Sequence, residues 1–487
     1  MLTSGRRDFL KGTAWMGAVA SLSGCAASKA MSSVCEPGMM TGFAVAPIKK
    51  VRIGLVGVGA RGPSAVQRLC EIPGVEIVAI CDLYKNRVER QISYLVGKKK
   101  AKPRGYWVYE SAKESGKDET AAYRELCQSD LDLVYICTPW AVHTPAALCA
   151  MENGKHAAIE VPSAMNLEEC WALVETAERT GRHCMQLENC CYGEIEMLTL
   201  NLVRQGKLGE LVHAEGAYIH DLRDYCYRDP AKGGYQGQWR LKWNARHTGN
   251  QYPTHGLVPL MQAMNINRGD RFDYLVSVSS APIGNDIFAV ARYGKDSWQA
   301  KVHPKRGDMS VTTIRTVKGR TIMVQHDVTS ARPYSRINLV SGTQGVLNDY
   351  PFRIALAGKP GGGAHGWFSP AEAGKIREQY KHPLWKVAGQ LAKKMGGHGG
   401  MDFLMDLRLC YCLQNGLPLD MTVYDLAASC SLCELTERSA THRGQSQDVP
   451  DFTRGAWKTA KPLGIESVDL AKFGLKDVPK GDAQLNV

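Results

Sequence analysis

One stretch constrains the fold of this chain more than any other, and it joins the apolar run at residues 51–56 (VRIGLV) to Gly57-Val-Gly59-Ala-Arg-Gly62. The apolar run is typical of a buried strand, and residues 63–70 can continue as a helix. Gly57 then allows the tight turn, Gly59 lets a pyrophosphate approach the backbone, and Gly62 lets the helix pack on the strand. The phosphates would lie at the N-terminus of that helix. The pattern predicts a Rossmann dinucleotide-binding domain.

A second apolar strand, residues 75–81, supports this prediction because it ends at Asp82, 20 residues after Gly62. An acid at this spacing accepts hydrogen bonds from the adenosine ribose hydroxyls. Its charge would repel a 2′-phosphate and so favours NAD, while nearby Arg87 leaves NADP as an alternative.

A third strand, residues 131–137, leads into Thr138-Pro-Trp-Ala-Val-His143. Loops at the carboxyl ends of such strands form the ligand crevice. His143 either contacts the cofactor there or is a structural loop histidine, and the sequence favours neither.

The region after residue 166 predicts a second domain. Several segments of alternating polarity indicate a large, open, mostly antiparallel sheet, so the chain belongs to the α/β class. We expect the strands at residues 211–219, 274–279, 287–293, 298–302, 310–317, 321–326 and 337–340. Residues 357–400 are rich in Gly, Lys and Pro and predict a loop excursion, and residues 401–414 and 423–438 predict helices.

The N-terminus resembles an export signal. Arg6-Arg7-Asp8-Phe9-Leu10-Lys11 fits the twin-arginine pattern, and the apolar stretch at residues 12–23 is too short to span a membrane. Leu22-Ser-Gly-Cys25 resembles a lipobox in which Cys25 would be acylated, and the alternatives are plain signal cleavage or no cleavage. We therefore expect a periplasmic protein, lipid-anchored if Cys25 is modified. Twin-arginine substrates are exported folded, which suits a protein that must first acquire a cytoplasmic cofactor.

These features divide the chain into segments. We assign the export signal to residues 1–25, a linker to 26–49, the dinucleotide domain to 50–165, a substrate-binding α/β domain to 166–445 with C-terminal helices at 401–445, and a tail to 446–487.

Composition excludes some functions. The net charge is +12 over 487 residues, without a dense Lys/Arg stripe, so we expect no nucleic-acid partner. The 16 cysteines lie mostly in apolar runs, where a thiol acts as a small hydrophobe. Cys430-Ser-Leu-Cys433 has metal-site spacing, but it lies in a helix-like segment without a second pair in the sequence. We expect no metal.

Three stretches are more polar and aromatic than a core requires: residues 217–222, 238–244 and 250–256. In the last, His255 follows Tyr252 by three residues in a Pro/Gly-broken loop. A histidine placed in this way can hold a sugar hydroxyl and move its proton. As a set, opposite a dinucleotide fold, the three stretches predict a substrate site.

The chain resembles the glucose–fructose oxidoreductase and inositol dehydrogenase superfamily over residues 50–445. Its motifs GVGARG, TPWAVHTP, IEVPSA, MQLENCCYG, GAYIHDLR, WRLKWNARHTGNQYPTHGL and GGHGGMDFLMDLRL resemble one branch in particular, glycoside hydrolase family 109, the NAD-dependent α-N-acetylgalactosaminidases. The resemblance implies an NAD site that includes Ala60, Arg61, Asp82, Trp140, His143, Glu160, Val161 and Asn189. It implies a sugar site that includes Tyr218, Arg240, Tyr252, Pro253, Thr254, His255 and Tyr334.

Val161 is the residue that separates the branches. Dehydrogenases of this superfamily carry Glu-Lys-Pro where this chain has Glu160-Val161-Pro162, and a valine cannot move a proton. The resemblance therefore implies a glycosidase whose sugar is oxidised, loses its leaving group by elimination, gains water and is reduced again. His255 would act as acid and base, supported by Tyr252.

The predicted export also favours a reaction in which the cofactor is regenerated. Outside the cytoplasm there is no NAD pool, so the cofactor must stay bound and be regenerated in each turnover. The substrate would be a small molecule or glycan with a terminal N-acetylated hexosamine, and we expect a homo-oligomer. The alternatives are an exported sugar oxidoreductase with tightly bound NAD(P) and a non-catalytic sugar sensor.

Overall fold

The structure is a computed structural model of the chain, and it describes residues 38–111, 114–358, 365–463 and 465–471. The export signal, Cys25 and residues 26–37 of the linker lie outside the described residues.

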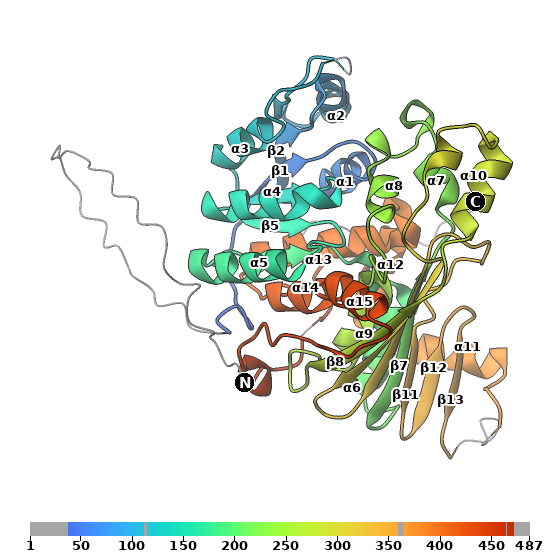
Figure 1. Cartoon of the computed structure of the whole chain (residues 1–487). Coiled ribbons are helices and arrows are strands. Elements are labelled where there is room, and N and C mark those ends of the chain that lie inside the picture. Colours follow the sequence, from blue (N-terminus) through green and yellow to red (C-terminus); the bar gives the residue numbers. More distant parts are fainter. Residues whose placement is uncertain (1–37, 112–113, 359–364, 464, 472–487) are drawn as a thin grey trace, which may run out of the picture. The chain divides into compact units, whose positions relative to one another are not determined.

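The first sheet is parallel and has six strands in the order β3-β2-β1-β4-β5-β6. The central strands are buried along nearly their whole length, because helices cover a parallel sheet on both faces. Figure 1 shows this sheet with its helices in the upper half of the view. The strands are β1 (Val51–Val56), β2 (Val75–Cys81), β3 (Arg104–Tyr106), β4 (Leu133–Ile136), β5 (His156–Ile159) and β6 (Cys184–Gln186), and the helices are α1 (Gly62–Leu69), α2 (Lys85–Gly97), α3 (Ala121–Gln128), α4 (Trp140–Glu152) and α5 (Leu167–Thr180).

The sixth strand extends this sheet beyond residue 165, where the sequence analysis ended the dinucleotide domain. β6 pairs in parallel with β5 from Cys184 to Gln186. A strand of three residues has too little periodicity to be recognised in sequence.

The second sheet has eight strands in the order β13-β12-β11-β7-β10-β9-β8-β14. Only the central pair β7 and β10 runs parallel among these neighbours, so the sheet is mostly antiparallel and the predicted fold class is confirmed. Its strands are β7 (Leu211–Ile219), β8 (Phe272–Ser279), β9 (Met309–Thr316), β10 (Thr321–Asp327), β11 (Leu339–Gly342), β12 (Gly345–Asn348), β13 (Arg353–Leu356) and β14 (Gln447–Asp448).

Two predicted strands are helical instead. Residues 287–293 lie in α10 (Gly284–Tyr293), and residues 298–302 contain the 3₁₀ turn η4 (Gln299–Lys301). The run at 287–293 is apolar and short, and such a run does not distinguish a strand from a helix. Ala289 is buried while Ile287 and Val290 are exposed, so the segment packs through one helical face.

The predicted loop excursion at residues 357–400 also contains two helices, α11 (Pro370–Gln379) and α12 (Pro383–Met395). Each has a recognisable start. Ser369 and Glu372 form a capping box before α11, and His382 accepts from the Leu384 amide at the start of α12. The high Gly, Lys and Pro content of the segment favoured a loop prediction, so these helix-capping residues were not recognised in the sequence.

The predicted C-terminal helices are α13 (Met401–Asn415), α14 (Val423–Cys430) and α15 (Leu432–Thr441). Figure 1 shows them between the two sheets. α13 contacts α1 and β1 of the first sheet, whereas α15 contacts β8 of the second. This C-terminal segment therefore joins the two layers, and Cys430 and Cys433 within it are buried free thiols.

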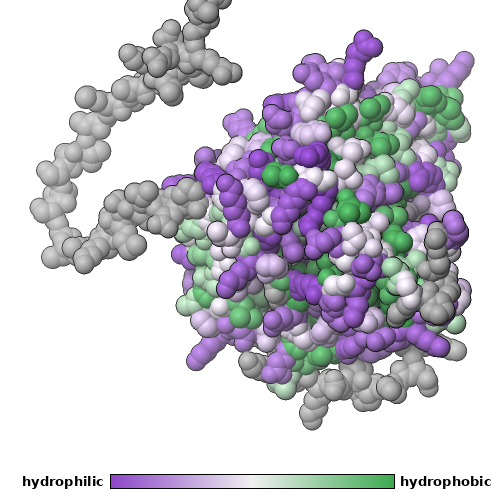
Figure 2. Space-filling model, turned by 90° about the horizontal axis from the view of Figure 1, so that it is seen from below, coloured by the Kyte–Doolittle hydropathy of each residue, from purple (hydrophilic) through white to green (hydrophobic). Residues whose placement is uncertain are grey.

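In the view of Figure 2, hydrophilic residues are scattered among hydrophobic ones over the whole face. None of the helices in the described part of the chain is long and apolar enough to cross a membrane.

Candidate active site

The glycine loop between β1 and α1 has the shape that a dinucleotide requires. Gly57 has a φ of +89°, and a Cβ on Gly62 would lie 2.1 Å from the Gly57 carbonyl oxygen. The turn is therefore open only to glycine at these two positions. Buried Asp82 follows β2, and its Oδ2 accepts from the Val58 amide at 2.9 Å. Together with the N-terminus of α1, this cradle fits the pyrophosphate and ribose of a dinucleotide.

Replacing Gly62 by alanine should weaken dinucleotide binding. The added methyl group meets the Gly57 carbonyl and the Val58 side chain, so the loop must move away from its binding shape. We expect the NAD content of purified Gly62→Ala protein, measured after denaturation, to fall at least about tenfold. Gly97→Ala is the matched control, because nothing lies within 4 Å of a Cβ at that glycine. Equal NAD content in the two variants would contradict this account of the loop.

Arg87 bears on the choice between NAD and NADP. Its Nη1 donates to Asp82 Oδ1 at 3.4 Å, and its Nη2 donates to Gln236 Oε1 at 2.7 Å. The guanidinium is thus paired with the acid that would bind the ribose, which favours NAD. The second bond also ties α2 to the loop that precedes α8 (Trp239–Asn244).

Arg61, Glu160 and Asn189 are brought together by a residue that the sequence analysis did not single out, Asp402 of α13. Arg61 pairs with Glu160 at 3.2 Å and with Asp402 at 3.3 Å, and Asn189 Nδ2 donates to Asp402 Oδ1 at 2.5 Å. Burial raises the pKa of Asp402, but the hydrogen bond with His398 and the charges of Arg61 and Arg68 outweigh burial and hold the pKa well below its ordinary value. The carboxylate stays ionised and connects α13 to the glycine loop.

A buried aromatic cluster lies on the substrate side and includes Trp140, Val161, Tyr218 and Tyr252. Tyr218 and Tyr252 stack with their ring centroids 4.5 Å apart. The guanidinium of Arg240 lies over Trp140 at 5.0 Å and over Tyr252 at 5.1 Å. Burial raises the pKa of both tyrosines, so their phenols are protonated and can donate hydrogen bonds. Aromatic faces beside a guanidinium can hold a sugar ring and its hydroxyls.

His255 lies in the first turn of α9 (Thr254–Ala263), and glycines let this helix approach β7 closely. A Cβ on Gly216 would lie 2.1 Å from the carbonyl oxygen of Gly256. The contact brings His255 to 5.2 Å from Tyr218 and 4.9 Å from Tyr252, measured between ring centroids. Its imidazole therefore lies at the edge of the aromatic cluster, in contact with both tyrosine rings.

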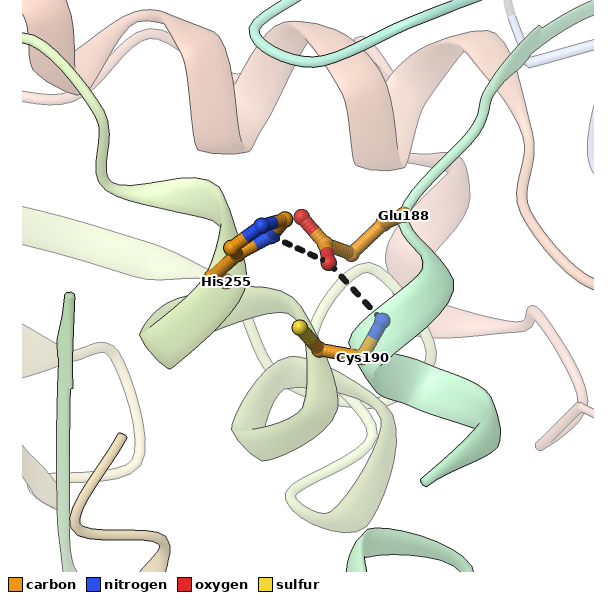
Figure 3. A group of neighbouring side chains, drawn as sticks. All are labelled: Glu188, Cys190 and His255. Carbon is orange, nitrogen blue, oxygen red and sulfur yellow. Dashed lines mark hydrogen bonds and ion pairs between the residues drawn. The ribbon is translucent and has the colours of Figure 1, made fainter. Parts of the chain in front are cut away.

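Glu188 orients this histidine, and the sequence analysis missed it. Glu188 is fully buried just after β6, and its Oε1 lies 2.7 Å from His255 Nδ1. The same oxygen accepts from the Cys190 amide at 3.0 Å, and Figure 3 shows the carboxylate and imidazole turned toward each other. Burial raises the pKa of Glu188, but the charge and hydrogen bond of His255 outweigh it and leave the pKa lowered. His255 Nδ1 thus donates to an ionised carboxylate, and Nε2 lies 3.5 Å from the Tyr252 hydroxyl.

Glu188, Cys190 and His255 also place three donor atoms within 4.8 Å of one another, as a metal site would. Two observations favour proton transfer. The carboxylate and imidazole already bond each other directly, and burial raises the pKa of Cys190 well above its ordinary value, so its thiol is protonated. A metal would need a thiolate and would have to break the Glu188–His255 bond.

The remaining predicted residues take different positions. Tyr334 is 39 % exposed, and its ring lies 5.2 Å from His220, whose Nδ1 bonds the Tyr218 hydroxyl at 3.0 Å. Pro253 and Thr254 form the start of α9. His143 is buried, with its ring nitrogens 2.7 Å from the Pro162 and Thr138 carbonyls. Its ring therefore braces the crevice loops.

Comparison with known families agrees with this division of the chain. Residues 192–459 match the family described as "Glycosyl hydrolase 109, C-terminal domain". Residues 51–187 match the family described as "Oxidoreductase family, NAD-binding Rossmann fold". The boundary between the two matches follows β6, the last strand of the parallel sheet.

Known relatives give the same result. A "Glycosyl hydrolase family 109 protein" of Shewanella woodyi is 48% identical over 86% of this chain and 88% of its own length. An "Alpha-N-acetylgalactosaminidase" of Shewanella oneidensis is 46% identical over 94% of this chain and 98% of its own length. Among solved structures, a levoglucosan dehydrogenase in complex with NADH is similar in fold, with a TM-score of 0.61 and 17% identity. The match covers 82% of this chain and 100% of the dehydrogenase chain.

These matches fit the shape of the glycine loop and the oriented histidine among aromatic rings. The chain therefore belongs to glycosyl hydrolase family 109, and it is a glycosidase built on an NAD-binding oxidoreductase fold.

Proposed function

We propose that the protein hydrolyses terminal α-N-acetylgalactosaminides by a redox-neutral cycle. The sugar is oxidised, loses its leaving group by elimination, gains water and is reduced again. The observation that carries this proposal is the Glu188–His255 pair of 2.7 Å at the edge of the aromatic cluster that also contains Val161. The Shewanella oneidensis relative, named for this activity, supports the choice of sugar.

The residues of the site have distinct tasks in such a reaction. When bound, NAD supplies a reversible hydride acceptor. His255 Nε2 takes and returns protons at the sugar, because its Nδ1 is committed to Glu188. Tyr252, 3.5 Å away, can extend that proton path. Arg240 donates hydrogen bonds to sugar oxygens, and the apolar Val161 takes no part in proton transfer.

We also propose that NAD is held tightly and recycled. Contacts on both sides of the glycine loop support this. Arg61 bonds Asp402 of α13, and Arg87 bonds Gln236, while Trp140 packs on Trp239 with ring centroids 5.0 Å apart. Release of the dinucleotide would require these contacts between segments to open.

Export, anchoring and assembly are further proposals. We propose that residues 1–25 direct the folded protein to the periplasm by the twin-arginine route and that Cys25 carries a lipid, supported by the motifs RRDFLK and LSGC. We also propose a homo-oligomer, supported by outward-facing apolar side chains on β8 and β9, namely Tyr274, Val278 and Val311.

An aryl α-N-acetylgalactosaminide tests the function. We expect purified protein to release the aryl group without added NAD and without net accumulation of NADH. In D₂O the product sugar should carry deuterium at C2, because elimination removes that proton. Oxidised sugar with stoichiometric NADH, or a requirement for a second sugar, would show an oxidoreductase. Product without deuterium at C2 would exclude the elimination route.

A further inference from the structure

A cavity of about 370 Å³ lies next to the sugar site, and the proposed reaction has not used it. Its walls come from the start of α6 (Glu194–Arg204), the segments around β11 and β12, and α12 with the loop that follows it. This volume is in the range of about 300–1,000 Å³ found for small-molecule sites. The lining includes Tyr334, Arg336, Asp349, Tyr350, Lys393 and His398.

The lining contains a fixed aromatic wall. Tyr334 and Tyr350 have ring centroids 5.9 Å apart, and the Arg336 guanidinium lies over both, at 5.6 and 5.3 Å. Buried Glu196 pairs with Arg336 at 2.6 Å, so the guanidinium is neutralised and cannot serve as an anion site. Arg336 Nη1 also donates to the Tyr334 hydroxyl at 2.9 Å, which fixes that ring.

Polar groups of both signs face this wall. The carboxyl of Asp349, the exposed ammonium of Lys393 and the imidazole of His398 line the same cavity. Lys393 lies 3.7 Å from Glu194, so its charge is partly balanced as well. Balanced donors and acceptors around aromatic rings suit a neutral, hydroxyl-rich ligand better than a phosphate or a carboxylate.

The cavity adjoins the sugar site through Tyr334. That ring is in edge contact with His220, which bonds Tyr218 of the aromatic cluster. On the other side, His398 bonds Asp402 at 3.0 Å, next to the glycine loop. The cavity therefore lies beside the residues proposed to hold the terminal sugar, with room for the group to which that sugar is linked.

We propose that the cavity is a subsite for the second sugar residue of a glycan, the one that leaves on hydrolysis. This rests on the proposed glycosidase function. It makes the natural substrate an oligosaccharide or glycoconjugate, with Tyr350 and Lys393 as determinants of its second residue.

Two substrates with the same terminal sugar test the subsite. One is the aryl α-N-acetylgalactosaminide, and the other is a disaccharide in which that sugar is linked to a neutral hexose. The measured quantity is the ratio of kcat/KM for the disaccharide to kcat/KM for the aryl glycoside. In Lys393→Met and Tyr350→Ala we expect this ratio to fall about five- to twentyfold, the size of one or two lost contacts. The control Trp367→Ala removes an exposed aromatic ring that stacks on Arg353 and does not line the cavity, and its ratio should equal that of the wild type.

The outcomes separate the two proposals. An unchanged ratio in both Lys393→Met and Tyr350→Ala overturns the subsite. If kcat/KM falls equally on both substrates, the ratio is also unchanged, and the loss instead places the terminal sugar itself in the cavity. Lys393 is exposed, so Lys393→Met should fold normally. The test therefore stays valid even if Tyr350→Ala fails to fold. Wild-type protein that cleaves neither substrate overturns the glycosidase function, and the subsite with it.

Discussion

His255→Asn is expected to lower kcat/KM on an aryl α-N-acetylgalactosaminide by about 10²–10⁴-fold, the usual contribution of a positioned acid–base group. Asparagine is similar in size but cannot accept and return a proton at this position. The variant should still contain NAD, because the glycine loop and Asp82 are built without His255. Activity assays and the 260 nm absorbance of released cofactor measure the two quantities. Wild-type activity in this variant would exclude His255 as the acid–base group.

A substitution at Glu188 tests whether this residue orients His255 through its charge or only fills space beside it. Glu188→Gln keeps the shape but removes the carboxylate that lies 2.7 Å from His255 Nδ1 and accepts its hydrogen bond. The imidazole then loses the acceptor that fixes its orientation, so kcat should fall at least about tenfold while the NAD content stays at the wild-type level. Glu437→Gln is the matched control, because Glu437 lies 2.8 Å from His247 outside the proposed sugar and cofactor sites. A wild-type kcat in Glu188→Gln would contradict this orienting role.

The glycine loop and the acid after β2 could be predicted because their signal is local. Gly57, Gly62 and Asp82 lie within about one βαβ unit, and each acts through its own backbone or through the next strand. Their spacing alone therefore predicts the tight turn, the first residue of the helix and the acid that follows the second strand. The structure shows why, since a side chain at Gly62 would strike the backbone of Gly57.

Glu188 and Asp402 could not be found in this way. Glu188 acts on a histidine 67 residues later, and Asp402 pairs with an arginine 341 residues earlier. No periodicity or spacing rule links residues at these separations, so only the fold brings them together. Asp402 lies in the family-like motif GGHGGMDFLMDLRL. The family resemblance therefore marks this segment but does not give the role of Asp402.

The errors in the second domain have a similar origin. The run at residues 287–293 is predicted as a strand from its alternating pattern, but it folds as α10. The inward face of that helix consists of buried Asn285 and Ala289 together with partly buried Phe288 and Tyr293. Strands β12 and β13 were missed because each has four residues. Tertiary packing decided both cases, whereas the longer strands β7, β9 and β10 followed their alternation.

Arg68→Met is expected to lower the free energy of unfolding by about 3–5 kcal/mol, because it breaks a buried ion pair by removing one partner. Arg68 of α1 is 3 % exposed, and its Nε donates to fully buried Asp406 of α13 at 2.7 Å. Its Nη1 also lies 3.5 Å from Asp402. The pair joins the layer of the dinucleotide domain to the C-terminal helices. Without Arg68, Asp406 would lose its ion-pair partner, while Asp402 would keep Arg61. Urea unfolding at neutral pH measures the change.

The pH dependence gives this prediction a second test. Burial already raises the pKa of Asp406, which Arg68 partly offsets, and without Arg68 the pKa must rise further. The added cost is therefore present above the raised pKa and is relieved as the pH falls toward the unfolded value, because Asp406 then becomes neutral. The stability gap between wild type and variant should narrow on acidification. Arg104→Met is the control: its pair with Glu125 is exposed on both sides, so its loss should cost less than about 1 kcal/mol at any pH. A loss of the same small size in Arg68→Met would mean that the buried pair is not what holds α1 to α13.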